Sequence, residues 1–147
     1  MINSLHLKEI RRFDPQINLV IPLYSYPISA GFPSTASDYI EKTLDLNEYL
    51  IKHPAATYFV HVQGDSMIEA GIHSGDLLTV DRSITPVNNA IVIAMVNGEF
   101  TVKRLRKKNG QIYLMPDNPK LAPTAVAGGM QVEIWGVVTY VIHKVVL

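Results

Sequence analysis

Apolar and polar positions in the second half of the chain follow the pattern of short β-strands. Tyr58, Val60 and Val62 alternate with Phe59 and His61, and a period of two residues is typical of a half-buried strand. Strand-length apolar runs follow at residues 77–80, 91–96, 111–115 and about 132–142. Asn-Gly pairs at residues 97–98 and 109–110 predict tight hairpin turns. These patterns together predict a mostly β fold of twisted antiparallel strands.

The first 55 residues have a different pattern. Residues 15–33 contain four prolines, Pro15, Pro22, Pro27 and Pro33. Proline at this spacing disfavours both a helix and a central strand, so we expect an extended, flexible arm. One short helix is predicted after it, with Asp45 as N-cap, Glu48 three residues later and Pro54 beyond its end. The predicted organisation is therefore an arm over residues 1–55 and a β-rich domain over residues 56–147.

Composition limits the classes of function. Lysine plus arginine and aspartate plus glutamate both number 13, and this zero net charge argues against a protein that mainly grips nucleic acid phosphates. The chain has no cysteine, which excludes disulfides, thiol catalysis and cysteine-based zinc sites. No apolar run approaches the roughly 20 residues of a membrane span. Residues 1–15 also lack the apolar segment of a signal peptide. We therefore expect a cytoplasmic protein with no membrane partner.

Ser66 is the first candidate for catalysis. It follows the predicted strand and a Gln63-Gly64 break, in the segment Gly64-Asp65-Ser66-Met67. With Glu69 three residues later, Ser66 has the spacing of a capping box, which predicts that a helix begins here. A helix N-terminus presents backbone N–H groups, and those of Asp65, Ser66 and Met67 could form an oxyanion hole around a serine nucleophile.

Lys103 is the second candidate. Alternation along its strand places Thr101, Lys103 and Leu105 on one face, separate from the flanking arginines. One interpretation is a solvated basic strand end, or a patch for an anionic partner. The other is that Lys103 is the amine that activates a serine in a Ser/Lys peptidase. The small-residue junction Ala30-Gly31 in the arm is a slim peptide bond that such a site could cut.

Other candidate chemistry is weaker. Asp76 and Asp81 bracket a strand and are expected to serve turns, and the chain has no glycine-rich phosphate loop. We expect no cofactor. Nor do we expect a metal site, because no metal-ligand spacing is shared by the five histidines, His6, His53, His61, His73 and His143.

Five segments carry a resemblance to a known family. They are Ala30-Gly31-Phe32-Pro33-Ser34, Gly64-Asp65-Ser66-Met67, Gly75-Asp76-Leu77-Leu78, Glu99-Phe100-Thr101-Val102-Lys103-Arg104-Leu105 and Trp135-Gly136-Val137-Val138-Thr139. In order and spacing, over about residues 28–143, they resemble the UmuD branch of the LexA/UmuD (S24) self-cleaving Ser/Lys peptidases. The combination is specific, whereas each motif alone is weak.

The resemblance implies a LexA/UmuD-like peptidase fold and a role for each motif. Ser66 is the implied nucleophile, Lys103 the general base and Ala30-Gly31 the scissile bond, cut within one chain or between the two chains of a dimer. The implied biology is the DNA-damage (SOS) response. There, a RecA filament on single-stranded DNA stimulates the cut. The trimmed homodimer then serves as accessory subunit of an error-prone, Y-family translesion polymerase.

The chain departs from the family pattern at three places. Ala30 stands where the branch often has cysteine, Thr35 where it often has a second proline, and Asn89-Ala90 where a Gly-Asp turn is usual. Only 30 residues precede the expected cut, so the winged-helix DNA-binding domain of LexA-type repressors is not expected. Two other functions remain open: a non-enzymatic homodimeric binding module with a vestigial dyad, and a type I signal peptidase, against which the missing membrane anchor counts.

Overall fold

The computed structural model describes residues 6–12, 20–24 and 40–146, with side chains from residue 44 onward. The chain divides into two compact units. One comprises residues 1–13 and 53–147, and the other comprises residues 14–52. Each unit is described by itself below.

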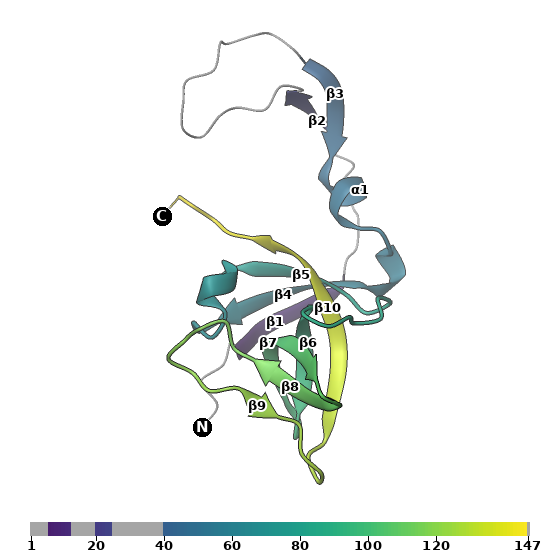
Figure 1. The fold of residues 1–147 in the computed structure, drawn as a ribbon. Coiled ribbons are helices and arrows are strands. Elements are labelled where there is room, and N and C mark those ends of the chain that lie inside the picture. The colour runs from purple at the N-terminus through teal and green to yellow at the C-terminus, as the bar shows by residue number, and fades with distance from the viewer. Residues whose placement is uncertain (1–5, 13–19, 25–39, 147) are drawn as a thin grey trace. The chain divides into compact units, whose positions relative to one another are not determined.

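The larger unit is built on one eight-stranded sheet in which all neighbouring strands are antiparallel (Figure 1). In spatial order the strands are β1 (His6–Arg12), β4 (Thr57–Gln63), β5 (Leu77–Asp81), β10 (Val132–Ile142), β6 (Ile91–Val96), β7 (Glu99–Lys108), β8 (Gln111–Met115) and β9 (Thr124–Ala125). The prediction of a mostly β, antiparallel fold is confirmed. The long strand β10 lies between β5 and β6 and joins the two parts of the sheet.

Two tight turns connect β6, β7 and β8. Asn97 and Gly98 have φ angles of 49° and 83°, and Asn109 and Gly110 have φ angles of 52° and 75°. Two successive positive φ values are the backbone of a type I′ turn, whose twist matches that of the flanking strands. The Asn-Gly pairs thus set these two hairpins, as predicted.

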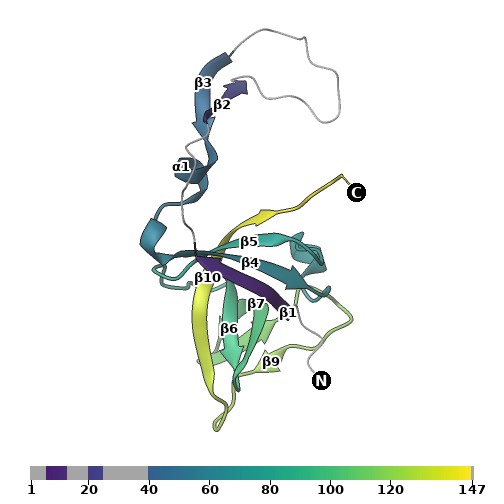
Figure 2. The ribbon, with the colours of Figure 1, turned by 180° about the vertical axis from the view of Figure 1, so that it is seen from behind.

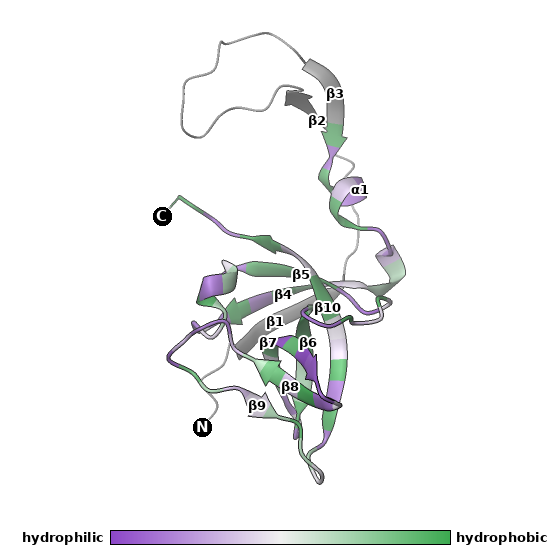
Figure 3. Ribbon diagram, in the orientation of Figure 1, coloured by the Kyte–Doolittle hydropathy of each residue, from purple (hydrophilic) through white to green (hydrophobic). Residues whose placement is uncertain are grey.

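Buried apolar side chains form two clusters on the sheet. The first consists of Val60, Val62, Met67, Ile72, Leu78, Val80, Ile93 and Val102. The second consists of Val92, Ala94, Val96, Leu105, Leu114 and Val137. Hydrophobic residues make up most of β5 (Figure 3), which is buried along nearly its whole length, as expected for a strand covered on both faces. Met67 and Ile72 belong to the segment after β4, so the core also anchors that segment.

The strand β1 was not expected from the sequence. It pairs with β4 from His6 opposite Gln63 to Arg12 opposite Tyr58, and it lies along β4 in the rear view (Figure 2). The predicted division between residues 55 and 56 places this strand with the arm, whereas its pairing places it in the sheet. It is an edge strand, and charged residues are common at sheet edges because they discourage pairing with other chains.

The smaller unit contains a two-stranded sheet and a helix. Here β2 (Val20–Tyr24) pairs antiparallel with β3 (Ile40–Asp45), within the region that was expected to be an extended arm. A proline is tolerated in β2 because a strand with one partner has an edge that needs no donor. The helix α1 (Leu46–Leu50) follows, and the Asp45 carboxylate accepts the Asn47 N–H at 2.9 Å. The predicted N-cap is therefore present.

The described helical segments are short: α1 and the two 3-10 turns η1 (Pro54–Ala56) and η2 (Ile68–Ala70). No helix in the described part of the chain is long and apolar enough to cross a membrane.

Candidate active site

Ser66 lies in the segment between β4 and β5, which several hydrogen bonds hold in place. Gly64 begins it with a φ of 108°, and its N–H donates to the Ser74 hydroxyl at 3.2 Å. Ile72 N–H donates to the Met67 carbonyl at 3.2 Å, and both side chains are fully buried. Ser66 itself is buried, at 0% exposure. Its hydroxyl is therefore held inside the protein on a segment anchored at both ends.

The helix expected at Ser66 is absent, and that prediction was wrong. Only the 3-10 turn η2 (Ile68–Ala70) forms, with Met67 at its N-cap position and no side-chain cap. The turn ends at Gly71, which has a φ of 80° and donates its N–H to Ile68. The left-handed glycine ends the turn after three residues. The Ser66–Glu69 spacing therefore does not mark the capping box of a longer helix.

Lys103 comes from β7, opposite β6. Thr101, Lys103 and Leu105, which strand alternation places on one face, are all buried, and so is Val102 on the other face. The Lys103 Nζ donates to Ser66 Oγ at 3.2 Å, to Thr101 Oγ1 at 3.1 Å and to the Val102 carbonyl at 3.3 Å. The structure thus brings the two candidate residues together, although 37 positions separate them in the chain.

The basic segment was interpreted either as a solvated strand end or as the source of a catalytic amine. Only the end of the segment is exposed to solvent. Arg106, Lys107 and Lys108 are exposed, whereas Lys103 is 4% exposed. Burial lowers the pKa of Lys103 from 10.5 to about 8, because a charged ammonium is poorly solvated inside the protein. A useful fraction of this amine is therefore neutral near neutral pH and able to accept a proton.

A loop after β8 braces the Ser66 segment from the other side. The Asn118 amide donates to the Asp65 carbonyl at 3.0 Å, and the Asp117 carbonyl accepts the Glu69 N–H at 2.9 Å. Asp117 N–H also contacts the Met67 sulfur at 3.3 Å. We call Asp117 and Asn118 the brace. Sequence reasoning missed both residues, since they lie about 50 positions from the segment they hold and belong to no recognisable motif.

Arg104, next to Lys103, fixes the brace to β7. Its guanidinium donates to both Asp117 carboxylate oxygens, with the shortest contact 2.6 Å from Nη2 to Oδ2. The carboxylate of Asp117 raises the pKa of Arg104 through this hydrogen bond. Adjacent residues of β7 therefore face the two sides of one site: Lys103 contacts the candidate nucleophile, and Arg104 holds the loop that supports it.

The unusual turn before β6 is well formed. Asn89 has a φ of 73°, a left-handed conformation that asparagine adopts more readily than most residues. Its N–H donates to the Leu105 carbonyl at 2.7 Å, and Leu105 N–H donates to the Ala90 carbonyl at 2.8 Å. Arg104 Nη1 also donates to the Asn89 carbonyl at 2.7 Å. Asparagine thus supplies the backbone geometry that glycine usually provides, and the departure leaves β7 in place.

The other predicted site features are only partly described. Ala30 and Gly31 lie outside the described residues. Within the described part of the chain, the N–H groups of Asp65 and Met67 make no hydrogen bond. The chemistry that the site can perform is proton transfer from a buried serine hydroxyl to a buried, partly neutral amine.

Comparison with known proteins places these residues in a family context. The sequence profile named Peptidase S24-like matches residues 22–139, which include both Ser66 and Lys103. Protein SamA of Salmonella typhimurium is 54% identical over 123 residues, which cover 84% of this chain and 85% of SamA. Protein MucA of Escherichia coli is 48% identical over 121 residues, 82% of each chain. The LexA repressor of Bordetella pertussis is 40% identical over 119 residues, 81% of this chain and 54% of the repressor.

Proposed function

This chain belongs to the Peptidase S24-like family, in its UmuD branch, and from this premise we propose that it is a self-cleaving serine peptidase. Ser66 is the nucleophile, Lys103 is its general base, and the bond between Ala30 and Gly31 is the one that is cut. The reaction is a single self-modification that releases residues 1–30 from residues 31–147.

One observation carries the proposal. The Lys103 Nζ lies 3.2 Å from Ser66 Oγ, and both side chains are buried. A general base must lie within hydrogen-bond reach of the proton it removes and have a pKa near the working pH. Both conditions are met, because burial lowers the pKa of Lys103 to about 8. A vestigial dyad in a pure binding module would have no reason to keep a lysine in this costly position.

The chemistry proceeds in two stages. In the first, neutral Lys103 accepts the Ser66 proton while Oγ attacks the Ala30 carbonyl carbon. Backbone N–H groups of Asp65, Ser66 and Met67 stabilise the oxyanion. Lys103 then gives the proton to the leaving Gly31 nitrogen, so the peptide bond breaks and Ala30 remains as an ester on Ser66.

In the second stage water completes the reaction. Neutral Lys103 accepts a proton from a water molecule, the hydroxide attacks the ester carbon, and the returning proton restores the Ser66 hydroxyl. Thr101 has a positioning role throughout, because its hydroxyl accepts a hydrogen bond from Nζ at 3.1 Å and keeps the amine beside Oγ. Small side chains at Ala30 and Gly31 let the bond approach the site closely.

The biological role follows from the UmuD branch. We infer that the protein acts in SOS mutagenesis in the cytoplasm and that a RecA filament on single-stranded DNA stimulates the cut. The trimmed homodimer then works as accessory subunit of a Y-family translesion polymerase. Sedimentation of residues 31–147 as a dimer, and recovery of a Y-family polymerase with it from damaged cells, would support this role. A monomer that brings down no polymerase would contradict it.

The peptidase is tested with Ser66→Ala. The purified full chain is incubated at alkaline pH and its fragments are weighed by mass spectrometry. We expect wild type to yield residues 1–30 and 31–147, and Ser66→Ala to stay intact with an unchanged fold. Ser83→Ala is the matched control, since the Ser83 hydroxyl donates to Asp81 in the turn after β5, and it should cut normally.

Either of two results would refute the assignment. Continued release of residues 31–147 from Ser66→Ala would show that another group is the nucleophile. An intact wild-type chain under all conditions, including addition of RecA filaments, would favour the binding module.

A further inference from the structure

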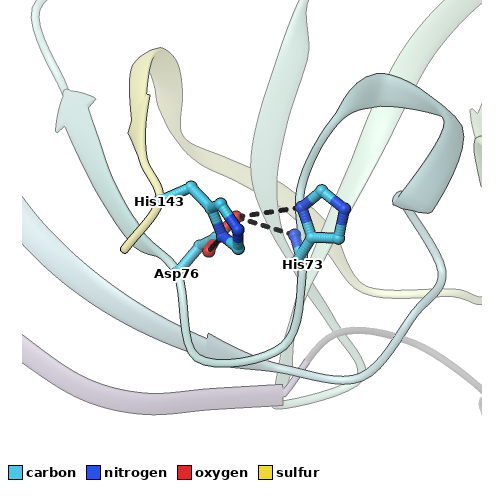
Figure 4. A group of neighbouring side chains, drawn as sticks. All are labelled: His73, Asp76 and His143. Carbon is cyan, nitrogen blue, oxygen red and sulfur yellow. Dashed lines mark hydrogen bonds and ion pairs between the residues drawn. The ribbon is translucent and has the colours of Figure 1, made fainter. Parts of the chain in front are cut away.

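Two histidines and a buried aspartate converge where β5 begins and β10 ends. His73 lies in the turn after η2, Asp76 directly precedes β5, and His143 directly follows β10 (Figure 4). Because Ile142 pairs with Leu77 in the β10–β5 ladder, the next residue of one strand falls beside the preceding residue of the other. Strand register therefore brings His143 to Asp76 across 67 positions of sequence.

Both histidines place Nδ1 near the Asp76 carboxylate. His143 Nδ1 lies 2.5 Å from Asp76 Oδ1, and His73 Nδ1 lies 3.7 Å from Asp76 Oδ2. One nitrogen or oxygen atom of each residue lies within 4.8 Å of the others, and no other group of three potential ligands converges in this way in the described part of the chain. The two imidazole rings lie 4.6 Å apart between centroids.

We propose that His73, Asp76 and His143 form a binding site for a divalent transition-metal ion of the Zn²⁺ class. Two imidazoles and one carboxylate are the donor set that such ions bind, with water at the fourth position. Ligand atoms around a tetrahedral zinc ion lie about 3.3 Å apart, given metal–ligand bonds of about 2.0–2.1 Å. In the structure one potential ligand atom of each residue lies within 4.8 Å of the others, so the side chains must shift to reach this spacing.

The site combines a fixed ligand with two adjustable ones. Asp76 is buried, whereas the His73 and His143 side chains are 46% and 45% exposed. The imidazoles can therefore rotate toward an ion, and water can reach the open position. The carboxylate is oriented by the His73 backbone N–H, which donates to Oδ2 at 2.7 Å. Such support of a ligand by a further hydrogen bond is usual in metal sites.

Hydrogen bonds also fix the backbone at Asp76. Its carbonyl accepts the Val62 N–H at 3.1 Å, and its own N–H donates to the His73 carbonyl at 3.0 Å. The same turn reaches the Ser66 segment, because Ser74 accepts the Gly64 N–H. A bound ion would fasten the residues after β10 to this turn.

A second histidine–aspartate pair shows what the site would be without its third ligand. His53 Nδ1 lies 2.5 Å from Asp81 Oδ2, and Asp81 is buried like Asp76. Its other oxygen accepts from the hydroxyl and N–H of Ser83, and among the described side chains no second imidazole joins the pair. His53 is therefore a matched control for a histidine that pairs with a buried carboxylate but has no metal to bind.

The test measures metal binding by the untagged full chain. After dialysis against excess Zn²⁺ and then metal-free buffer, elemental mass spectrometry should find one zinc ion per chain, removable by EDTA. Co²⁺ in place of Zn²⁺ should give the visible absorption of a tetrahedral site, whereas Mg²⁺, which prefers oxygen ligands, should not compete. His73→Gln and His143→Gln should each weaken zinc binding at least tenfold, since loss of even a supporting residue costs about 10–100-fold.

Folding is monitored in the same experiment. Thermal unfolding in EDTA should be similar for wild type and both variants, because the histidines are half exposed, and added Zn²⁺ should raise the melting temperature of wild type only. His53→Gln should bind zinc as wild type does. The proposal is overturned if wild type retains no stoichiometric zinc, if either histidine variant binds it equally well, or if His53→Gln loses it to the same extent.

Discussion

The pH dependence of self-cleavage offers a quantitative test of the role of Lys103. Burial places its pKa at about 8 in the folded chain instead of 10.5. At pH 7 the neutral fraction is then about one tenth, roughly 300-fold more than for a lysine with its ordinary pKa. Because only the neutral amine can accept the Ser66 proton, the rate should follow this fraction.

We expect the cleavage rate to rise nearly tenfold per pH unit below about 8 and to level off above about 9. The assay weighs fragments of the purified full chain between about pH 6 and 10, with circular dichroism to show that the fold persists. Lys103→Ala should abolish the reaction. Lys103→Arg should abolish it too, because a guanidinium stays charged in this range.

The lowered pKa of Lys103 also makes the folded chain less stable at neutral pH. Between about pH 8 and 10.5 the unfolded chain binds more protons than the folded chain, so the free energy of unfolding rises with pH across this window. The total change is on the order of 3 kcal/mol. Lys103→Met should therefore be more stable than wild type at pH 7 and lose this rise, with lost hydrogen bonds offsetting part of the gain.

The reasoning on Lys103 fails on either of two results. A cleavage rate that is flat from neutral to alkaline pH, in a chain that stays folded, would mean that Lys103 is not the base. Equal pH dependence of stability in wild type and Lys103→Met would mean that its pKa is not lowered.

Three further predictions concern other parts of the molecule. Gly31→Val should block the cut without disturbing the fold, because a β-branched side chain obstructs approach of the bond; mass spectrometry showing an undiminished cut would move the site. Asn118→Ala should slow cleavage with little change in its pH profile, because Asp65 loses the amide that holds its carbonyl; a wild-type rate would show that this brace residue is dispensable. Gly136→Ala should destabilise the chain by about 1–3 kcal/mol in urea unfolding, since its new Cβ would lie 2.5 Å from Val80 Cγ1; unchanged stability would contradict the close packing there.

Much of the sheet could be predicted from local pattern. Strands β6, β8 and β10 have the bounds that the apolar runs indicate, and the two Asn-Gly turns lie where expected. Strand β1 escaped prediction because it pairs on one side only, so its sequence needs little apolar character. The expected helix at Ser66 failed because a cap spacing says nothing of Gly71, which ends the turn after three residues.

The candidate site, too, could be predicted only in part from the sequence. Alternation along β7 predicted which face Lys103 takes, and the structure shows that face buried. What local sequence could not show is which residues meet across the fold. The brace, and the approach of His143 to Asp76, depend on pairings between distant strands. The cluster of His73, Asp76 and His143 was missed for that reason, because its members do not share the short spacing that is typical of metal ligands.

The position of β10 in the sheet has a consequence for folding during synthesis. The strand that leads to Ser66 belongs to the β1-β4-β5 part, and the strand that carries Lys103 belongs to the β6-β7-β8-β9 part. In the described sheet, β10 alone joins the two by hydrogen bonds, and the ribosome makes it after every other described strand. The strand pairing that joins the two parts of the sheet is therefore complete only once residues 132–142 have been made.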